Sequence, residues 1–520
     1  MEIKNEADFT RIIKCRDTHT ESSAEYILPD YLGDVRRILF TSVSVKPAGT
    51  FLGSDKVECS GILVYDIIYL DAEDKLSAVQ FTSEYDYDLK CPVENCRDAI
   101  SDTRVSAYSI RLSGPRKIAA KASLTGEVRL TAEDKLSLEG DTEDAGEDRE
   151  LATRPVKLRS TARSSVTERE CAEAVAKLDS AIAEEVSVVF CDASAEVESI
   201  EASEGELTLK GKMRMSAVIK NGENNVFSAE KLMNFQESLP FENAEGDMKF
   251  IPDVTVTSLK SNVNPCEDGC EIVLSCIMEL SALGEKNNKM EIITDGYLKS
   301  RECTNQYGEF CFSEFLDLVT ASGNHSASLP RSEITSGKLR EVIFITAEPR
   351  VENIIKDDEG IKILGDIVYS GVASEMDEEG NIGFAMIKFG SPFATNVNID
   401  CQNPEKLTYE AKVKARAATA SIDAENLYTS CTVEASVVFC QERSEKVLLS
   451  MTAQDAQPYE KCASTIRVYY PTAEDTLFSV ARRYHTSPIK IAADNSLSES
   501  VMSRDGCQGN LAGVKKLIIY

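Results

Sequence analysis

Five cysteines near the middle of the chain come closest to a metal-binding pattern. They are Cys266, Cys270, Cys276, Cys303 and Cys311, and four cysteine thiolates are a common ligand set for structural zinc. Their spacing differs from that of a zinc knuckle, and Cys270 and Cys276 fall on one face of an alternating strand pattern. We therefore predict that these thiols pack in a core, with no metal and no cofactor. Late oxidative cross-linking of exposed thiols is a separate hypothesis.

The motifs that position catalytic groups are missing from the sequence. It contains three histidines (His19, His325 and His485) and neither a Gly-x-Ser-x-Gly nor a His-Glu-x-x-His pattern. The segment from Gly205 to Met213 resembles a phosphate-binding loop only superficially. Five residues separate its glycines instead of four, and Met213 replaces the Ser or Thr that would bind magnesium. We predict a protein that is not an enzyme, so any ATP hydrolysis must come from a partner.

The last part of the chain has the pattern of a small α+β module. Ile466–Tyr470 alternates as a short strand, and positions 477, 480, 481 and 484 form an apolar helical stripe. Asp475 lies near the start of this helix, where an acid satisfies free N–H groups. Ser487 and Pro488 predict the start of a second helix, and Lys516–Tyr520 predicts a closing strand. The expected order is therefore strand, helix, helix, strand.

Three similar blocks upstream predict three copies of one domain. Each block has a glycine with apolar residues four and two positions before it and two positions after it, which is a strand pattern in which glycine marks a bulge or a close backbone approach. A phenylalanine precedes each glycine by 21 residues, and the pairs are Phe40 and Gly61, Phe190 and Gly211, and Phe344 and Gly365. The copies recur about every 150 residues, which is too long for a solenoid repeat, so each copy is expected to be a domain.

Runs rich in Val, Ile, Thr and aromatic residues follow each glycine and predict antiparallel β structure. Each copy has a segment led by a phenylalanine and then an alternating run: Phe81 and Ile118–Leu130, Phe227 and Glu271–Leu280, and Phe384 and Leu427–Phe439. Upstream of the C-terminal module, helix is expected only near Asp34–Leu39 and at Glu168–Ile182. The predicted fold is multidomain and mainly β, with three tandem antiparallel β-rich domains and a small α+β module (β-α-α-β).

Changes in composition predict the domain boundaries. Glu139–Glu150 is strongly acidic, Ala321–Leu329 is small and polar, and Met451–Cys462 leads into the last module. The predicted parts are an N-terminal segment at 1–25, repeat 1 with an acidic tail at 26–150, repeat 2 at 151–325, repeat 3 at 326–455 and the C-terminal module at 463–520.

The charge and hydropathy of the chain restrict its partners and its location. A formal net charge of −30 argues against nucleic acid as a partner. The N-terminal Met1–Cys15 lacks the apolar core of a secretory signal, and the best apolar stretch, Ile62–Leu70, is short and contains Asp66. We therefore expect no transmembrane segment and a cytosolic protein whose partners are proteins or neutral ligands.

The C-terminal module resembles the LysM domain. The usual Gly-Asp-Thr-Leu-Trp-Ser-Ile-Ala signature corresponds to Glu474–Ala481, and the later Asn-Asn-Leu corresponds to Asp494–Leu497. The resemblance implies a binding surface at the start of the first helix and in the loop before the last strand. The candidate partner-binding or ligand-binding residues are Asp475, Thr476, Leu477, Phe478, Asn495, Leu511, Ala512, Gly513 and Val514. In the alternative interpretation Asp475, Leu477 and Asn495 only cap and pack the module.

The three upstream copies resemble the SPOCS domain of sporulation proteins. The entry segment Leu28–Leu39 is similar to the start of that family, and the strands around the three repeat glycines and the segment Phe227–Phe241 fit its core. Tandem SPOCS-type domains with a terminal LysM domain are similar to the clostridial spore coat morphogenetic proteins.

This resemblance implies a non-enzymatic scaffold in the mother-cell cytoplasm, at the forespore surface and in the spore coat. Its implied partners are a coat morphogenetic ATPase, bound through the LysM-type module, and other coat proteins. The alternative function is binding of peptidoglycan, a polymer that contains N-acetylglucosamine, in the cell wall or the spore cortex.

Overall fold

The computed structural model describes the chain except for residues 1–5, 16–17, 92–94, 139–147, 180–184, 223–224, 243, 245, 402–403, 455–458, 460–465, 473, 498–510 and 512. Most of the two stretches expected as linkers at 139–150 and 451–462 lies outside the described residues. Within the described part, no helix has the length and apolar character that crossing a membrane requires.

Three units of one design, each made of antiparallel strands, form most of the described chain. The first contains β1 Glu6–Lys14, β2 Thr18–Ile27, β3 Val35–Leu52, β4 Lys56–Asp71, β5 Leu76–Lys90, β6 Cys96–Gly114 and β7 Lys117–Ser137. The second contains β8 Arg149–Asp179, β9 Ser187–Ser203, β10 Glu206–Lys220, β11 Val226–Pro240, β12 Lys249–Cys266 and β13 Gly269–Leu298. The third contains β14 Cys303–Pro330, β15 Lys338–Lys356, β16 Gly360–Met376, β17 Ile382–Asn398, β18 Leu407–Ile422 and β19 Asn426–Ala453.

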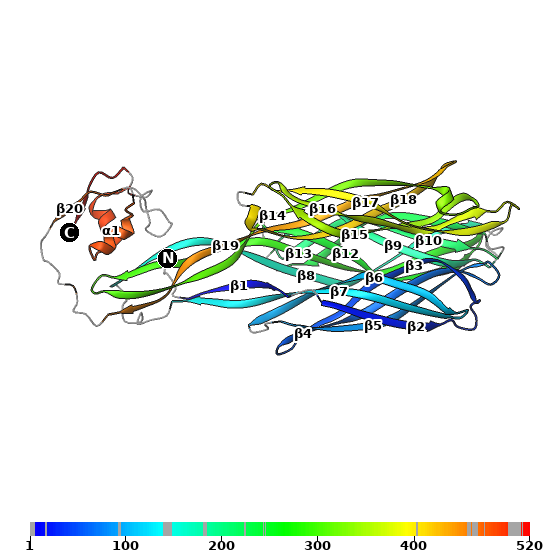
Figure 1. Ribbon diagram of the computed structural model, residues 1–520, viewed down its shortest axis with the longest axis horizontal. Coiled ribbons are helices and arrows are strands. Elements are labelled where there is room, and N and C mark those ends of the chain that lie inside the picture. The colour runs from blue at the N-terminus through cyan, green and yellow to red at the C-terminus, as the bar shows by residue number, and fades with distance from the viewer. Residues whose placement is uncertain are drawn as a thin grey trace.

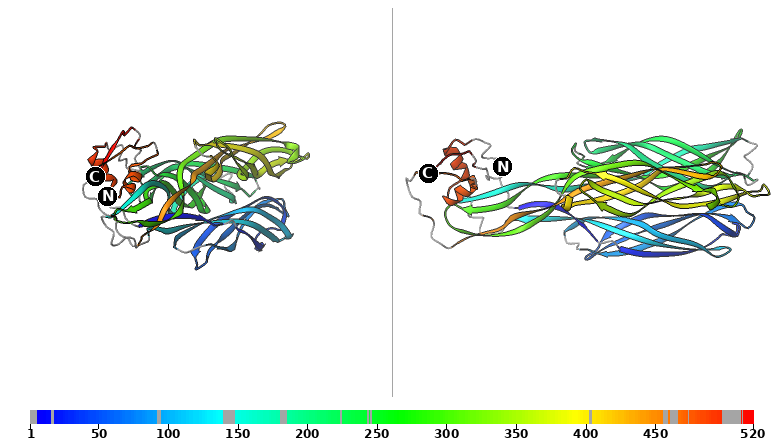
Figure 2. Two further views of the ribbon diagram at one scale, coloured as in Figure 1. Left: turned by 60° about the vertical axis from the view of Figure 1, so that its left-hand side comes forward. Right: turned by 45° about the horizontal axis from the view of Figure 1, so that its top comes forward.

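Each unit is a sandwich of two sheets around its own apolar core. One sheet has the order β3-β4-β5, β9-β10-β11 or β15-β16-β17. In the other sheet the last strand of the unit lies in the middle, as in β12-β13-β8 and β18-β19-β14. In the first unit the middle strand is β7, with β6 on one edge and both β1 and β2 on the other. The mainly β, antiparallel class predicted from the sequence is therefore confirmed. Figure 2 shows the three units side by side along their length.

Two expected helices and one expected boundary are wrong. Residues 35–39 begin β3, which pairs with β4, and residues 168–179 lie in β8, which pairs with β13. Backbone pairing with a neighbouring strand therefore overrides the local helical pattern. Ala321–Leu329 lies inside β14, and Ala321 is paired with Ala435 of β19. Residues 303–330 consequently belong to the third unit, although repeat 2 was expected to extend to residue 325.

The repeat glycines lie where neighbouring backbones approach most closely. A Cβ atom at Gly211 would lie 1.9 Å from the carbonyl oxygen of Glu196, and one at Gly365 would lie 2.0 Å from that of Arg350. Both positions also coincide with a register shift against the adjacent strand. The sequence predicted a bulge or a close backbone approach, and both are present at Gly211 and Gly365.

The repeat phenylalanines meet one another where the three units adjoin. The ring centroids of Phe40 and Phe344 are 5.0 Å apart, those of Phe190 and Phe344 are 5.0 Å apart, and those of Phe40 and Phe190 are 5.6 Å apart. Apolar residues of all three units surround them, including Ile68, Val218 and Ile343. The fixed sequence offset therefore marks a contact in which one side chain from each unit takes part.

A buried ionic network forms a second connection between the three units. Arg159 of β8 donates two hydrogen bonds to Glu285 of β13, at 2.9 and 2.6 Å, and one to Glu410 of β18 at 3.0 Å. Glu410 also accepts from Arg129 of β7 at 2.5 Å and lies 3.0 Å from Lys14 of β1. The side chain of Glu285 is fully buried, and those of Arg159 and Glu410 are each 8% exposed. One carboxylate of the third unit is thus shared by cations of the first two.

The network changes the acidity of Glu410. Burial by itself would raise the pKa of this carboxyl, but the charges of Arg159, Arg129 and Lys14 outweigh burial and lower its pKa from 4.5 to about 2. The ionised form is therefore the form that the folded protein stabilises.

Long strands extend from the three units toward one end of the molecule and form a stalk (Figure 1). The stalk consists of three two-stranded ribbons: β1 with 129–137 of β7, 149–158 of β8 with 288–298 of β13, and 303–314 of β14 with 441–453 of β19. Small apolar clusters hold the ribbons together, and in one of them Phe9 of the first unit packs edge-on against Phe310 of the third, with centroids 5.0 Å apart.

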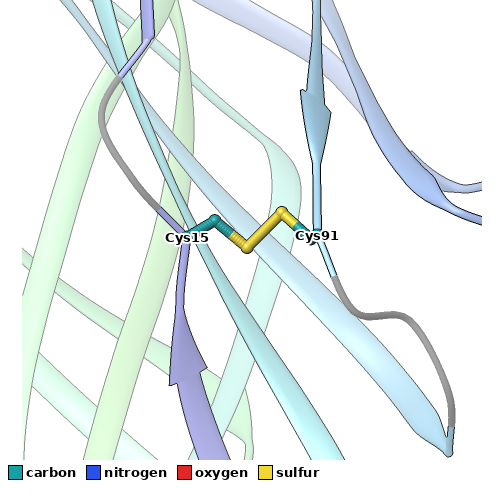
Figure 3. The surroundings of a disulfide bond; sticks show 2 residues. All are labelled: Cys15 and Cys91. Atoms are coloured by element: carbon teal, nitrogen blue, oxygen red, sulfur yellow. A yellow bond between two sulfur atoms is a disulfide. The ribbon is translucent and has the colours of Figure 1, made fainter.

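A disulfide lies where the first unit departs from the other two. Its edge strand is divided into β1 and β2, whereas β8 and β14 are continuous. Cys15, at the end of β1, is bonded to Cys91, at the end of β5 (Figure 3). This bond ties the first ribbon of the stalk to the opposite sheet of the unit. Buried cysteines elsewhere, such as Cys59, Cys431 and Cys440, are free thiols.

Replacement of Phe40 by Ala should destabilise all three units together. Phe40 is 4% exposed, and truncation of a buried phenylalanine typically costs about 3–5 kcal/mol. We expect a lower unfolding midpoint in calorimetry. Phe51→Ala is the matched control, because Phe51 is 67% exposed and its loss should change stability by less than about 0.5 kcal/mol. Equal midpoints for the two variants would contradict a central role for the phenylalanine contact.

Glu410→Gln should reduce stability at neutral pH more than in acid. Because the folded pKa of Glu410 is lowered to about 2, its contribution is complete above the unfolded pKa near 4.5 and is lost as the pH falls toward 2. We expect a loss of about 3 kcal/mol at pH 7 that shrinks to less than half by pH 3. Urea unfolding at both pH values measures this, with exposed Glu352→Gln as control. A loss independent of pH would contradict the ionic account.

Candidate functional site

The C-terminal module contains β20 Arg467–Tyr469, α1 Leu477–Arg483, α2 Pro488–Asp494 and β21 Leu517–Ile519. The element order is the one expected from the sequence, although each strand has three residues and each helix seven. Both helices contribute to one small core with β21, and its buried members include Leu477, Val480, Ile491, Leu517 and Ile519.

Asp475 and Thr476 hold the start of α1 in place. The Asp475 carboxylate accepts hydrogen bonds from the Tyr469 hydroxyl at 2.7 Å and from the backbone N–H and the hydroxyl of Thr472 at 2.8 and 2.9 Å. The backbone hydrogen bond from Thr472, followed by that from Tyr469, lowers the pKa of this carboxyl. Thr476 caps α1 and forms a reciprocal capping box with Ser479. Asp475 therefore links the end of β20 to the first helix.

Asn495 has the corresponding role at the end of α2. Its side-chain N–H groups donate to the carbonyl oxygens of Ile491 and Ile518 at 2.8 and 2.7 Å, and its side-chain oxygen accepts from the Ile518 N–H at 2.6 Å. This side chain thus joins the second helix to the closing strand.

The module is packed against the end of the stalk. Phe478 of α1 lies edge-on to Tyr297 of β13, with centroids 5.1 Å apart, and the Tyr297 hydroxyl donates to the Thr486 carbonyl oxygen at 2.6 Å. The Arg482 guanidinium lies 2.9 Å from the carboxylate of Asp295. These contacts place the α1 side of the module on the β13 end of the stalk, as Figure 1 shows.

Most of the predicted binding residues are consequently interior. Asp475, Leu477, Phe478 and Leu511 are between 1% and 7% exposed, and Asn495 is committed to internal hydrogen bonds. Thr476 and Val514 are half-buried and Gly513 is exposed, so these three are the accessible members of the set. Ala512 and the segment 498–510 lie outside the described residues. Glu474, which precedes Asp475 in the chain, is also exposed.

A second accessible surface was missed in the sequence. Three alternate residues on and beside β20 are strongly exposed: Ile466 at 63%, Val468 at 53% and Tyr470 at 69%. Val468 is paired with Ile518 of β21, and Tyr520 is 60% exposed. Directly paired side chains share one face of an antiparallel sheet. We define the outer face of the module as Ile466, Val468, Tyr470, Ile518 and Tyr520.

The alternation at 466–470 contained the signal for this surface. Two helices cover only one side of a two-stranded sheet, so apolar residues on the other side stay in solvent unless a partner covers them. Two cations, Lys515 and Lys516, are exposed in the segment that leads into β21, whereas Arg467 is paired with Ile519 and lies over the Tyr484 ring on the helix-covered side. Residues 466–520 contain seven Lys or Arg and five Asp or Glu, a net charge of +2, whereas residues 1–465 carry −32.

The residues considered above for metal or phosphate binding lie in or beside strands of the β units. Cys270 and Cys276 are buried on one face of β13, as predicted, but core packing is wrong for Cys266 and Cys311, which are exposed at strand positions, and Cys303 is half-buried. In the segment from Gly205 to Met213, Lys212 follows the second glycine as in a phosphate-binding loop, but it lies in β10 and forms an ion pair with Glu198. Among the residues that the structure describes, no group of three or more His, Cys, Asp or Glu side chains is arranged to hold a metal ion.

Comparison of the chain with protein families, with curated proteins and with solved structures found no match.

Removal of the stalk contacts should release the module. The double variant Tyr297→Ala with Arg482→Ala deletes the aromatic contact, the hydrogen bond to Thr486 and the ion pair with Asp295. We expect amide hydrogen exchange around α1 to become at least about tenfold faster, which corresponds to about 1.4 kcal/mol. Tyr470→Ala, on the outer face, is the control and should leave exchange at α1 unchanged. Unchanged exchange in the double variant would contradict docking through these residues.

Proposed function

We propose that this chain is a non-enzymatic scaffold of spore coat assembly, in which three SPOCS-type units form the body and a LysM-type module binds a coat morphogenetic ATPase. The proposal rests on the resemblance of the entry segment Leu28–Leu39, the strands around the repeat glycines and the Glu474–Ala481 segment to those families. It assigns the protein to the mother-cell cytoplasm, at the forespore surface. The partner ATPase supplies nucleotide hydrolysis, and other coat proteins bind the scaffold.

The observation that carries the choice of a protein partner is the outer face of the module. Val468, Tyr470 and Tyr520 are more than half exposed on this small domain, and a contiguous apolar surface of this kind is typical of a protein–protein contact. The cations beside it favour an acidic partner surface and faster encounter with it. Thr476, Gly513 and Val514 form a second accessible edge of the module.

The module's attachment also favours a protein partner over a glycan. Phe478 replaces the usual tryptophan of the LysM signature and is only 5% exposed, because it packs on Tyr297 of the stalk. A sugar-binding surface requires accessible aromatic or backbone groups, and this part of the signature is used for attachment instead. Meanwhile the outer face stays open, and the stalk holds it at one end of the molecule (Figure 1).

The decisive experiment compares binding of the full chain to the purified coat ATPase and to purified peptidoglycan. We expect binding to the ATPase, and we expect Val468→Asp to weaken it at least about 30-fold, because a charge would be buried in an apolar contact. Tyr470→Ala should weaken binding about tenfold or more.

Ile489→Ala is the matched control, since Ile489 is an equally exposed apolar residue (64%) on α2, outside the outer face. It should bind the ATPase as the unmodified chain does. Binding to peptidoglycan without binding to the ATPase would overturn the proposal and support the cell-wall alternative. Equal losses of ATPase affinity in Val468→Asp and Ile489→Ala would show that the outer face is not the binding surface.

A further inference from the structure

Four sulfur atoms from four strands meet inside the second unit. Cys171 of β8 is paired directly with Cys276 of β13, and Met213 of β10 is paired directly with Met233 of β11. These two cross-strand pairs belong to the two opposing sheets of the sandwich, and the packing of the sheets brings them together in one core.

The sulfur atoms are in contact across the sandwich. Cys276 Sγ lies 3.7 Å from Met213 Sδ, and Cys171 Sγ lies 3.8 Å from Met233 Sδ. The two cysteines are direct cross-strand neighbours. In a tetrahedral site with metal–sulfur bonds of about 2.3 Å, neighbouring sulfur atoms are about 3.8 Å apart. The two sulfur–sulfur contacts across the sandwich therefore match the edge of such a tetrahedron.

The other two units have no sulfur at the corresponding positions. Corresponding positions lie at the same distance from the repeat glycine or from the start of the last strand, and their partners follow from the strand register. In the first unit the counterparts of Met213, Met233, Cys276 and Cys171 are Leu63, Ser83, Leu124 and Thr20. In the third unit they are Ile367, Ser391, Val433 and Gly323. The fold itself thus does not require sulfur here, and aliphatic or small side chains fill the same places.

Two of the four sulfur-containing residues are buried and two are partly accessible to solvent, as a binding site for an ion from solution requires. Met213 and Cys276 are at most 2% exposed. Cys171 and Met233 are half-buried, on the edge strands β8 and β11, which lie against each other. An ion can therefore reach the two outer sulfur atoms from solvent and be held by the two inner ones. The nearby carboxylates Glu173 and Glu237 are paired with Lys231 and Arg169, so the sulfur atoms themselves are the ligands that the site offers.

We propose that Cys171, Met213, Met233 and Cys276 form a binding site for one copper(I) ion. Thiolate and thioether sulfur are soft ligands that select monovalent copper, whereas zinc sites use thiolate, imidazole and carboxylate ligands and not thioethers. Binding would convert two thiols to thiolates and release two protons, so that each thiolate and each thioether contributes one electron pair to the metal. The site would join all four strands and stabilise the second unit.

The competing explanation is a sulfur-rich core without a ligand, since methionine readily fills gaps between sheets. Burial raises the pKa of both thiols, that of Cys276 to about 11, so they are protonated near neutral pH when no metal is bound. Met215 and Met278 are also buried in this core but outside the four-sulfur cluster. They provide controls that separate metal binding from core packing.

The test is an anaerobic titration of the reduced full chain with copper(I), in competition with the chromogenic chelator bicinchoninate. Copper is kept below one equivalent, so that the tightest site fills first. We expect one tight site per chain in the unmodified protein. Met233→Leu should weaken it at least about tenfold and Cys171→Ser at least about 100-fold. X-ray absorption should find four sulfur neighbours in the unmodified protein and three in Met233→Leu.

Met215→Leu is the control, because it changes the same core without touching the four ligands, and it should bind copper(I) like the unmodified chain. Met233→Leu keeps every thiol and nearly the same volume, so its effect cannot come from adventitious thiolate binding or from misfolding. If Met233→Leu and Cys171→Ser both bind with unchanged affinity, or if Met215→Leu loses as much affinity as Met233→Leu, the proposal is overturned.

Discussion

Contact among Phe40, Phe190 and Phe344 determines how the three units are arranged. The three rings come from the equivalent strands β3, β9 and β15. Each ring lies at a register shift in its strand, where the backbone turns the side chain toward the other units. Three aromatic rings that pack mutually bury one another without requiring any unit to contribute a special surface. The arrangement repeats in space because the phenylalanine repeats in the chain, and the ribbons of the stalk continue the same three-part order.

The ionic network around Glu410 has a different physical character. Buried charges are costly unless they are fully paired, and removal of one partner leaves the others exposed to that cost. Arg159 and Glu410 each bond to two or more partners, and these come from all three units. Apolar packing at the phenylalanines tolerates small displacements, whereas hydrogen-bonded ion pairs do not. The network therefore specifies the relative register of the units more strictly than the apolar contact does.

Two parts of the molecule carry the functional proposals, one at the end of the stalk and one inside the second unit. At the end of the stalk, α1 of the C-terminal module is anchored through Phe478, so that the outer face around Val468 remains available. In the second unit, β8 and β11 meet at the edge of the sandwich and bring Cys171 beside Met233. The first surface suits a protein partner, and the second suits a soft metal ion. The same repeated fold thus supports different chemistry in different copies, because the core needs only apolar or small side chains at most positions.

The sequence by itself determined the strand-rich fold, the three copies and the order of elements in the last module. Those features are encoded locally, by alternation of apolar residues, by glycine at bulges and by Ser487 and Pro488 at the start of α2. The tertiary structure alone decided that residues 35–39 and 168–179 are strands, since pairing with β4 and β13 outweighs local helical preference. It also placed Phe478 against Tyr297 and brought Cys171 to Met233, residues that are far apart in the chain. Such contacts depend on how sheets stack and how units pack, and the periodicity of a single strand contains no information about its distant neighbours.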